Sequence, residues 1–284
     1  MKILDSAALR LRAAGIESPR LEARLLLAHA AGASQAEIVA GPIVADTGTH
    51  ARFDRLVDRR IAHEPLAYIL GRREFWSLDF QVGPGVLIPR PESETLVEAA
   101  LRRYPERDEN LKVLDLGTGS GCLLLAFLSE RNNAQGVGVD ISDEALAWAR
   151  RNAENLGLSE RARFVRDDWG RALSEVFDVV FVNPPYVKSA DIAALAPELA
   201  AHEPAMAFDG GRDGLDAYRA VAAVLLPRMD ARGCAFLELG QGQAEAASKI
   251  FTKAGFLIEG TVNDLARIKR CLVMVAAEQH LQQR

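Results

Sequence analysis

The spacing of apolar residues changes along the chain, and each change predicts a different kind of element. From Lys2 to about His63, apolar residues recur at helical intervals, which predicts a small helical bundle. The stretch from Glu74 to Val82 alternates apolar and polar residues around a short polar turn, so we expect a β-hairpin there. Further on, short apolar runs alternate with helical segments up to an antiparallel pair at Val262 and residues 271–275. This alternation predicts an α/β fold built on a doubly wound parallel sheet.

These patterns divide the chain into a helical domain over residues 1–72, a β-hairpin linker over 73–85 and an α/β domain over 86–284. The helical domain is too small to be the catalytic body, so we expect it to be an accessory domain that recognises a substrate. The outer face of its last long helix is predicted to hold Arg52, Arg55, Arg59 and Arg60. Asp54 and Asp58 lie between these arginines, which favours a solvated face; a docking surface for a protein partner is the alternative.

Composition and charge argue against several classes of function. The 284 residues carry a formal net charge of −5, with the acidic excess after residue 85, which disfavours DNA or RNA as a direct partner. Three isolated cysteines and five scattered histidines lack metal-ligand spacing, so no metal site is expected. The first apolar stretch contains Asp5 and Arg10, unlike a signal peptide, and the apolar run 122–128 is far too short to cross a membrane. We therefore expect a cytoplasmic protein with no membrane partner.

A glycine-rich turn follows the first predicted strand of the α/β domain, residues 112–116. It consists of Gly117, Thr118, Gly119, Ser120 and Gly121, and it leads into a helix. Glycines let the backbone approach a ligand closely at a helix N-terminus. The dinucleotide fingerprint would need glycine at position 122, where this chain has Cys122, and Asp115 in the strand would repel a pyrophosphate.

Carboxylates beside this turn suit a different cofactor. Asp115 suits a positively charged group such as the ammonium of a methionine moiety. Asp140 ends the next strand, where a carboxylate can accept hydrogen bonds from ribose hydroxyls. The ordered trio of Asp115, the glycine turn and Asp140 indicates S-adenosyl-L-methionine more than NAD. After the third strand, Asp168 and Trp169 are predicted to bond the adenine amino group and pack on its ring; alternatively, Trp169 is a core residue at the rim.

The apolar strand 178–182 ends at Asn183-Pro184-Pro185-Tyr186. Two prolines cannot continue a central strand, so the chain must leave the sheet at its carboxyl end, where ligands of α/β proteins bind. The rigid turn would hold the Asn183 amide and the Pro184 carbonyl as acceptors, and Tyr186 could cover a planar substrate group. The plainer interpretation is that these residues only open a loop, with the Asn183 side chain bonding nearby backbone.

Several longer segments together resemble one family, the bacterial peptide-chain release factor N5-glutamine methyltransferases. The matching segments are Pro65 to Gly71, Val86 to Glu92, Asp115 to Gly121, Asp168-Trp169, Asn183 to Tyr186 and Asp209 to Asp216. The resemblance is weakest in the first helices and at the end of the chain. It also departs at Asp264 to Arg270, where the family usually has Gly-Arg-Asp-Arg and only the last arginine is in place.

The resemblance implies a seven-stranded class I methyltransferase (Rossmann-like) domain after the helical bundle. It implies a monomer that uses S-adenosyl-L-methionine to methylate the side-chain nitrogen (N5) of the glutamine in a Gly-Gly-Gln segment of a release factor. Cofactor binding is expected at Asp115, Gly117 to Gly121, Asp140, Asp168, Trp169 and Asn183. The implied catalytic residues are Asn183, Pro184 and Tyr186, with substrate binding by the same residues, Pro185 and Arg90. Arg90 lies in a proline-rich segment predicted as either the lip of a pocket or a connector.

Three alternatives remain open at this point. A glutamine methyltransferase acting on a ribosomal protein would carry the same chemistry. A DNA or RNA amino-methyltransferase shares the Asn-Pro-Pro-Tyr tetrapeptide, but a basic target-recognition region is missing here. A binding module that retains adenosylmethionine without turnover is the third.

Overall fold

The computed structural model describes residues 2–40 and 47–277. The chain forms two compact units. The first comprises Met1–Arg72 together with Ala196–His202, and the second comprises Arg73–Leu195 and Glu203–Arg284. The division at residues 72 and 85 into a recognition domain and a linker remains a prediction, because a compact unit is not by itself a functional domain.

The first unit is helical, as its apolar spacing predicts. Its helices are α1 (Lys2–Ala13), α2 (Pro19–Ala31), α3 (Gln35–Ala40), α4 (Thr47–Ile61), α5 (Leu66–Leu70) and α9 (Pro197–His202). Pro19 occupies the first turn of α2, and Gly32 ends that helix in the left-handed region. Before α3, the Ser34 hydroxyl accepts from the Glu37 amide at 3.2 Å while the Glu37 carboxylate accepts from the Ser34 amide at 2.8 Å. This capping box fixes where α3 begins.

One of the four arginines predicted on the outer face of α4 lies elsewhere. Arg52, Arg55 and Arg59 are exposed, but Arg60 is only 3% exposed. Its guanidinium contacts the carboxylates of Glu22 and Glu198, each at 2.5 Å. The prediction was wrong for Arg60 because position 60 follows the buried Phe53 by seven residues and therefore shares its face of the helix.

A hairpin of β1 (Arg72–Phe75) and β2 (Leu78–Gln81) follows α5, and from Arg73 onward it belongs to the second unit. Its two turn residues, Trp76 and Ser77, both have φ in the left-handed region, at 54° and 57°. This geometry is that of a tight hairpin turn, in which Asn-Gly is usual. Side-chain acceptors hold the turn here: the Trp76 amide donates to Glu94 at 2.8 Å and the Ser77 amide to Glu74 at 2.6 Å.

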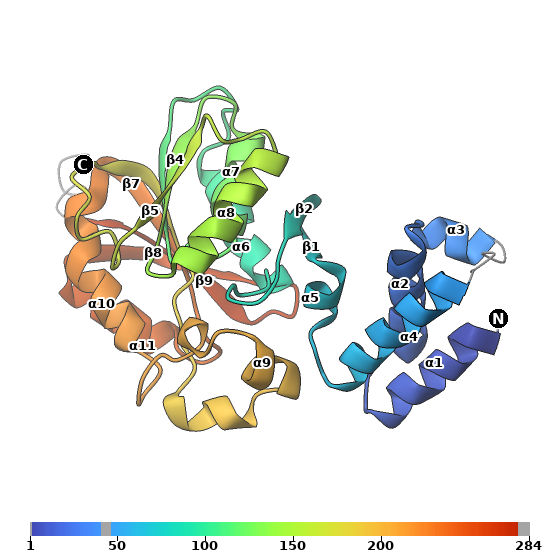
Figure 1. Cartoon of the computed structure of the whole chain (residues 1–284). Coiled ribbons are helices and arrows are strands. Elements are labelled where there is room, and N and C mark those ends of the chain that lie inside the picture. The colour runs from blue at the N-terminus through green and yellow to red at the C-terminus, as the bar shows by residue number, and fades with distance from the viewer. Residues whose placement is uncertain (1, 41–46, 278–284) are drawn as a thin grey trace. The chain divides into compact units, whose positions relative to one another are not determined.

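The predicted seven-stranded α/β fold is confirmed. The sheet lies at the centre of the second unit (Figure 1). Its strand order is β5-β4-β3-β6-β7-β9-β8. The first five strands in this order, β5, β4, β3, β6 and β7, are parallel to one another. Strand β9 is antiparallel to both of its neighbours, β7 and β8. The strands are β3 (Lys112–Leu116), β4 (Gln135–Asp140), β5 (Ala162–Arg166), β6 (Phe177–Val182), β7 (Met229–Glu238), β8 (Phe256–Asn263) and β9 (Lys269–Ala276).

Helices cover both faces of this sheet, and one hydrophobic cluster lies under each layer. The first layer is α6 (Glu94–Arg103), α7 (Cys122–Glu130) and α8 (Asp143–Asn155), and the second is α10 (Asp216–Leu225) and α11 (Ala244–Lys253). The sequence pattern predicts a helix through about Met229, but α10 ends at Leu225 and a 3₁₀ turn, Leu226–Arg228, follows it. Pro227 cannot continue the α-helical bonding, and β7 begins at Met229, whereas the apolar run predicts that this strand begins at Cys234.

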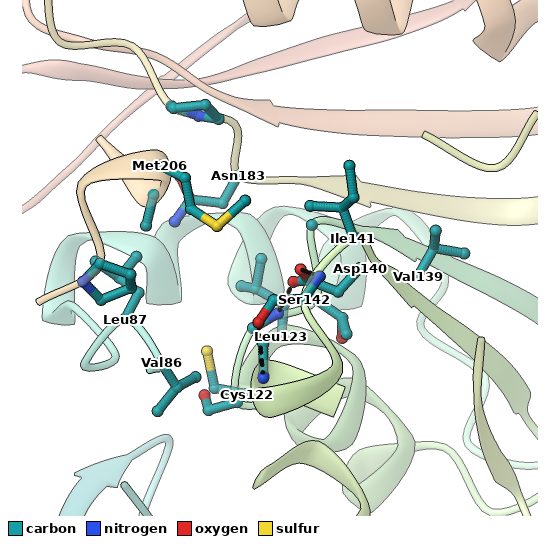
Figure 2. A pocket seen from close by; sticks show the side chains of 18 of the residues that line it. Val86, Leu87, Cys122, Leu123, Val139, Asp140, Ile141, Ser142, Asn183 and Met206 are labelled. Carbon is teal, nitrogen blue, oxygen red and sulfur yellow. Dashed lines mark hydrogen bonds between the residues drawn. The ribbon is translucent and has the colours of Figure 1, made fainter. Parts of the chain in front are cut away.

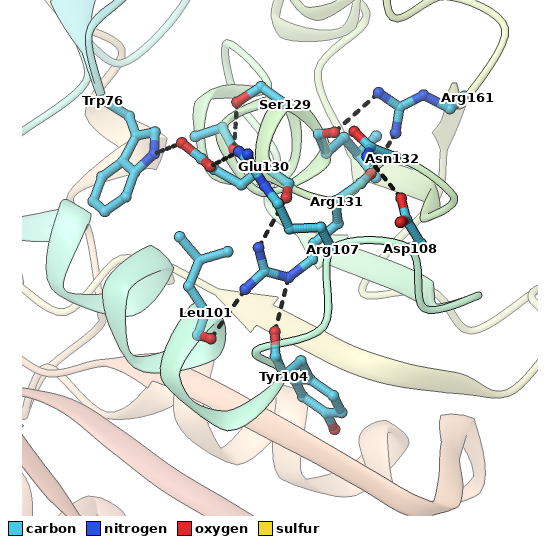
Figure 3. Close-up of polar contacts among 12 residues, drawn as sticks. Trp76, Leu101, Tyr104, Arg107, Asp108, Ser129, Glu130, Arg131, Asn132 and Arg161 are labelled. Atoms are coloured by element: carbon cyan, nitrogen blue, oxygen red, sulfur yellow. Dashed lines mark hydrogen bonds and ion pairs between the residues drawn. The ribbon is translucent and has the colours of Figure 1, made fainter.

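Two arginines, the buried Arg131 and the half-buried Arg161, close the ends of helices in the first layer (Figure 3). Arg131 donates to the carbonyl oxygens of Leu101 and Tyr104 at the end of α6, at 3.0 and 2.8 Å. Arg161 donates to the carbonyls of Leu128 and Arg131 at the end of α7, at 3.0 and 2.7 Å. Burial lowers the pKa of both guanidinium groups. These contacts satisfy carbonyls that a helix end leaves without partners.

Candidate active site

A pocket of about 230 Å³ lies at the carboxyl ends of the central parallel strands (Figure 2). Parallel topology gathers these strand ends at one edge of the sheet. Predicted residues that line the pocket are Arg90, Gly117, Thr118, Gly119, Ser120, Asp140, Asp168, Trp169, Asn183 and Pro185. Four other predicted residues, Asp115, Gly121, Pro184 and Tyr186, are not in its lining.

The glycine turn after β3 lies next to Trp169 and Asn183, and it is bonded to the end of β4. Gly117 has φ of 72°, and a side chain there would lie 3.6 Å from the Trp169 ring and 3.7 Å from the Asn183 carbonyl oxygen. The Gly119 amide donates to Asp140 Oδ2 at 2.9 Å, which joins the turn to the end of β4. Asp140 Oδ1 accepts from the Ser142 amide, also at 2.9 Å. Burial raises the pKa of Asp140, and these backbone donors partly offset that effect.

Asp115 lies inside β3 and is 1% exposed. Its Oδ2 accepts a hydrogen bond from the Thr118 hydroxyl at 2.6 Å. Its Oδ1 is buried without a hydrogen-bond partner among residues 2–40 and 47–277. Burial raises the pKa of Asp115 to about 7. A buried acceptor without a partner is costly, so this oxygen suits a cationic or hydrogen-bonding group of a ligand, reached directly or through water.

Asp168 and Trp169 follow β5 at the same edge of the sheet. The Asp168 carboxylate pairs with Arg171 at 2.5 Å, and its side chain is 45% exposed. Trp169 has φ of 56°, a conformation that costs energy for a bulky residue. Its ring both lines the pocket and packs against the hydrophobic cluster on the α10 side of the sheet. Ring stacking and core packing, considered as alternatives above, are therefore compatible with the same side chain.

Asn183 follows β6, and its side chain reaches across the pocket wall. Its Nδ2 donates to the Ser93 hydroxyl at 3.3 Å, 90 residues away in sequence. Within the described part of the chain, that side chain makes no hydrogen bond to the backbone of its own turn. Ser93 donates in turn to Glu238 Oε2, and both residues are 1% exposed. The interpretation of Asn183 as a simple loop opener therefore lacks the local contact that it requires.

Tyr186 is oriented toward the protein interior. Its hydroxyl donates to Glu238 Oε1 at 3.1 Å, and burial raises its pKa. Its carbonyl accepts from Gln243 Nε2 at 3.0 Å. A side chain on Gly214 would lie 2.6 Å from that same carbonyl, so glycine is required for this close packing. These contacts hold the backbone that follows the two prolines.

Arg90 lines another part of the pocket and is held by Glu203, which lies outside the lining. Arg90 Nη2 donates to Glu203 Oε1 at 2.5 Å, and the Ile88 amide donates to Glu203 Oε2 at 3.0 Å. The Glu203 side chain is 1% exposed, whereas that of Arg90 is 29% exposed. Met206 and Ile141 also line the pocket and are half exposed, at 54% and 50%. Figure 2 shows Met206 near Asn183 and Ile141 beside Asp140.

Sequence reasoning missed Ser93, Glu203 and Glu238. Glu238 lies between Leu237 and Leu239 at the end of an apolar strand, and an acidic residue in such a run is a signal for a buried polar network. Ser93 and Glu203 carry no comparable local signal.

Within the described residues, no helix is long and apolar enough to cross a membrane.

Comparisons with known proteins agree with this architecture. Residues 2–71 match the PrmC N-terminal domain family, and residues 107–207 match a methyltransferase domain family. The chain is 43% identical over 273 residues to the release factor glutamine methyltransferase of Rhodospirillum rubrum, covering 96% of this chain and 83% of that protein. It is 42% identical over 277 residues to the protein of the same name from Caulobacter vibrioides, covering 97% and 96%.

A solved structure shares the fold at low sequence identity. The methyltransferase from Pyrococcus furiosus has a TM-score of 0.52 and is 16% identical. The match covers 80% of this chain and 98% of that one.

Proposed function

Because the chain belongs to the release factor glutamine methyltransferase family, we propose that it methylates the side-chain amide nitrogen (N5) of the glutamine in the Gly-Gly-Gln segment of a peptide-chain release factor, using S-adenosyl-L-methionine. The chain is an enzyme of the methyltransferase class. One observation carries the proposed site: Asn183, at the end of β6, lines the same pocket as Asp140 and the glycine turn. Donor and acceptor of a methyl group could therefore meet there.

The pocket residues fit S-adenosyl-L-methionine. Its sulfonium supplies an electrophilic methyl group when the cofactor is bound. The unpartnered Oδ1 of Asp115 suits the ammonium group, and the glycine turn leaves room for the ligand to approach the backbone. Asp140, held by two backbone amides, retains lone pairs for ribose hydroxyls. Asp168 and Trp169 would receive the adenine, the first by accepting from its amino group and the second by stacking.

Asn183 and Pro184 would orient the glutamine. An amide nitrogen is a poor nucleophile because its lone pair is delocalised into the carbonyl. Asn183 Oδ1 and the Pro184 carbonyl would accept hydrogen bonds from the amide NH₂ and hold the nitrogen in line with the methyl group. The same two acceptors would stabilise the positive charge that grows on nitrogen. The methylated nitrogen is acidic and loses its proton afterwards, so no strong base is needed before attack.

The remaining predicted site residues have supporting roles in this proposal. Tyr186 and Pro185 hold the turn that carries both acceptors, with Tyr186 anchored on Glu238. Arg90, which already pairs with Glu203, would use its remaining donors on carbonyl groups of the substrate peptide. We further propose that the helical N-terminal unit contacts the release factor outside its Gly-Gly-Gln segment, and that the enzyme acts as a cytoplasmic monomer without nucleic acid.

Mass spectrometry tests this function. The enzyme is incubated with S-adenosyl-L-methionine and either a full-length release factor or ribosomal proteins. The control is a release factor whose Gly-Gly-Gln glutamine is replaced by glutamate. We expect one added methyl group on the glutamine of the intact release factor and none on the control. Methylation of a ribosomal protein with an unmodified release factor would overturn the proposed substrate.

A further inference from the structure

A chain of hydrogen bonds leads from the pocket into the protein interior. The Asn183 amide lies at the pocket, the Ser93 hydroxyl is next, and the Glu238 carboxylate ends the chain. Tyr186 donates to the other oxygen of the same carboxylate at 3.1 Å. Asn183 follows β6, Ser93 precedes α6 and Glu238 ends β7, so these hydrogen bonds join three segments that are distant in sequence. Both Ser93 and Glu238 are 1% exposed, so bulk water does not compete with these bonds.

The direction of the protons in this chain follows from counting donors. An ionised carboxylate can only accept, so Ser93 must use its single proton on Glu238. The Ser93 oxygen can then only accept from Asn183, which requires the NH₂ group of the Asn183 amide on that side. The Oδ1 atom is thereby left for another donor. The two ends of an amide are nearly the same size, so this network, rather than shape, distinguishes them.

We propose that Ser93 and Glu238 are positioning residues that orient the Asn183 side chain with its oxygen toward the glutamine NH₂. This inference rests on the proposed function, and it extends that function to two residues outside the reacting groups. An Asn183 amide turned the other way would present its own NH₂ to the substrate NH₂, and two donors cannot bond each other. Glu238 therefore acts on the Asn183 amide without touching it, through the Ser93 hydroxyl, while its other oxygen accepts from Tyr186.

Protonation of Glu238 would reverse the donor and acceptor roles along these hydrogen bonds. A neutral Glu238 can donate to Ser93, which can then donate to Asn183 Oδ1 and turn the amide around. Burial raises the pKa of Glu238, so this event falls at a higher pH than for an exposed glutamate. Among the groups that act on Glu238, Arg270 on β9 and the hydroxyls of Ser93 and Tyr186 favour the charged form. Glu92 opposes it, and the ionised forms of Tyr218, Cys122 and Cys271 would repel Glu238 as well.

Kinetics of matched variants test the proposal. Single-turnover methyl transfer is measured from pH 5 to pH 9 for wild type, Ser93→Ala, Ser93→Thr and Glu238→Gln. We expect Ser93→Ala to slow transfer about three- to tenfold at neutral pH, as loss of one hydrogen bond would. In wild type the rate should fall at low pH as Glu238 becomes protonated, and Ser93→Ala should abolish this acid limb of the pH profile. Ser93→Thr keeps the hydroxyl and should restore both the rate and the limb. Glu238→Gln should lose the limb as well.

A control variant and the cofactor affinity separate positioning from folding. Ser248→Ala removes a hydroxyl that bonds the Ala244 carbonyl at 2.7 Å in α11, outside the pocket, and should leave rate and pH profile unchanged. Affinity for S-adenosyl-L-methionine should stay unchanged in Ser93→Ala. A Ser93→Ala enzyme with the wild-type rate and the wild-type acid limb would overturn the inference, whereas failure of wild type to methylate the release factor would overturn the proposed function.

Nuclear magnetic resonance decides the inference even without turnover. The side-chain NH₂ signals of Asn183 are assigned by their absence in Asn183→Asp. In wild type we expect these signals to shift as Glu238 titrates, and in Ser93→Ala we expect this shift to disappear. The same titration in both proteins would show that Ser93 does not connect Glu238 to the amide, and the inference would fail.

Discussion

The backbone amide of Gly119 donates to Asp140 Oδ2 across 2.9 Å, so the glycine turn after β3 is tied to the carboxylate that ends β4. The bond fixes one oxygen of Asp140 at the pocket edge, while the Ser142 amide holds the other. A carboxylate held in this way is preorganised to accept hydrogen bonds from a diol. The proposed cofactor site therefore depends on a contact between the turn after β3 and the end of β4, the strand next to β3 in the sheet.

Substitution of Asp140 should weaken cofactor binding. Asp140→Ala removes the proposed ribose acceptor and should cost roughly 1.5–3 kcal/mol of binding free energy, the range for hydrogen bonds to a charged group. Calorimetry with S-adenosyl-L-methionine measures this. Asp143→Ala is the matched control, because that carboxylate is exposed and pairs with Arg166 at the surface. Equal affinities for wild type and Asp140→Ala would remove Asp140 from the site.

The buried Asp115 should make stability depend on pH. Its pKa is about 7 in the folded protein against 3.8 for the free side chain, so between these values the folded state binds more protons than the unfolded state. The free energy of unfolding therefore falls as pH rises toward 7. Deprotonation of Asp115 between pH 5.5 and 8.5 should by itself lower the free energy of unfolding by about 2 kcal/mol.

The contribution of Asp115 is isolated by comparison with Asp115→Asn. Urea unfolding at both pH values gives the loss for each protein, and Asp140 and Glu238, whose pKa values are also raised, contribute equally to both. The loss of unfolding free energy between the two pH values should be about 2 kcal/mol smaller in Asp115→Asn than in wild type. Parallel behaviour of the two proteins would mean that Asp115 does not titrate in this range.

Loss of the Arg131 side chain should destabilise the fold without changing the chemistry. Arg131→Ala leaves the carbonyls at the end of α6 without their donor, and we expect a loss of about 2–4 kcal/mol in unfolding free energy. Arg107→Ala is the control, because the Arg107 side chain is 65% exposed and its ion pair with Glu130 should contribute less than about 1 kcal/mol. Thermal melts measure both, and similar midpoints would contradict the role given to Arg131.

Removal of the first helices tests the role of the N-terminal unit. A protein lacking residues 1–63 should keep its affinity for S-adenosyl-L-methionine, because every residue of the pocket lies in the second unit. Its KM for a full-length release factor should rise several-fold, while its KM for a short Gly-Gly-Gln peptide should stay the same. Unchanged kinetics with the full-length factor would exclude a recognition role.

Most of the site residues that sequence could predict stand at the ends of strands, and Arg90, in a proline-rich segment, is an exception. The glycine turn, Asp140 and Asn183 each follow an apolar run, and parallel topology brings the carboxyl ends of the runs together. No local pattern shows which distant polar residues pair with each other: Ser93 and Glu238 are 145 residues apart, and Arg90 and Glu203 are 113 residues apart. Which polar groups meet inside a core depends on packing that no local spacing records. Arg60 shows the same limit, since its charge suggested solvent and its helical position placed it inside.

The most direct test of the account is the rate of methyl transfer by Asn183→Ala. Single-turnover transfer from saturating S-adenosyl-L-methionine to a release factor is measured beside a thermal melt of the same sample. Without the Asn183 acceptor, we predict a rate lower by roughly 10²–10³-fold, or about 3–4 kcal/mol, by analogy with loss of one oxyanion-hole donor. Stability should fall by only ~1 kcal/mol or less, because this half-buried amide fills little core volume. A stable variant that transfers the methyl group at the wild-type rate would contradict the proposed mechanism.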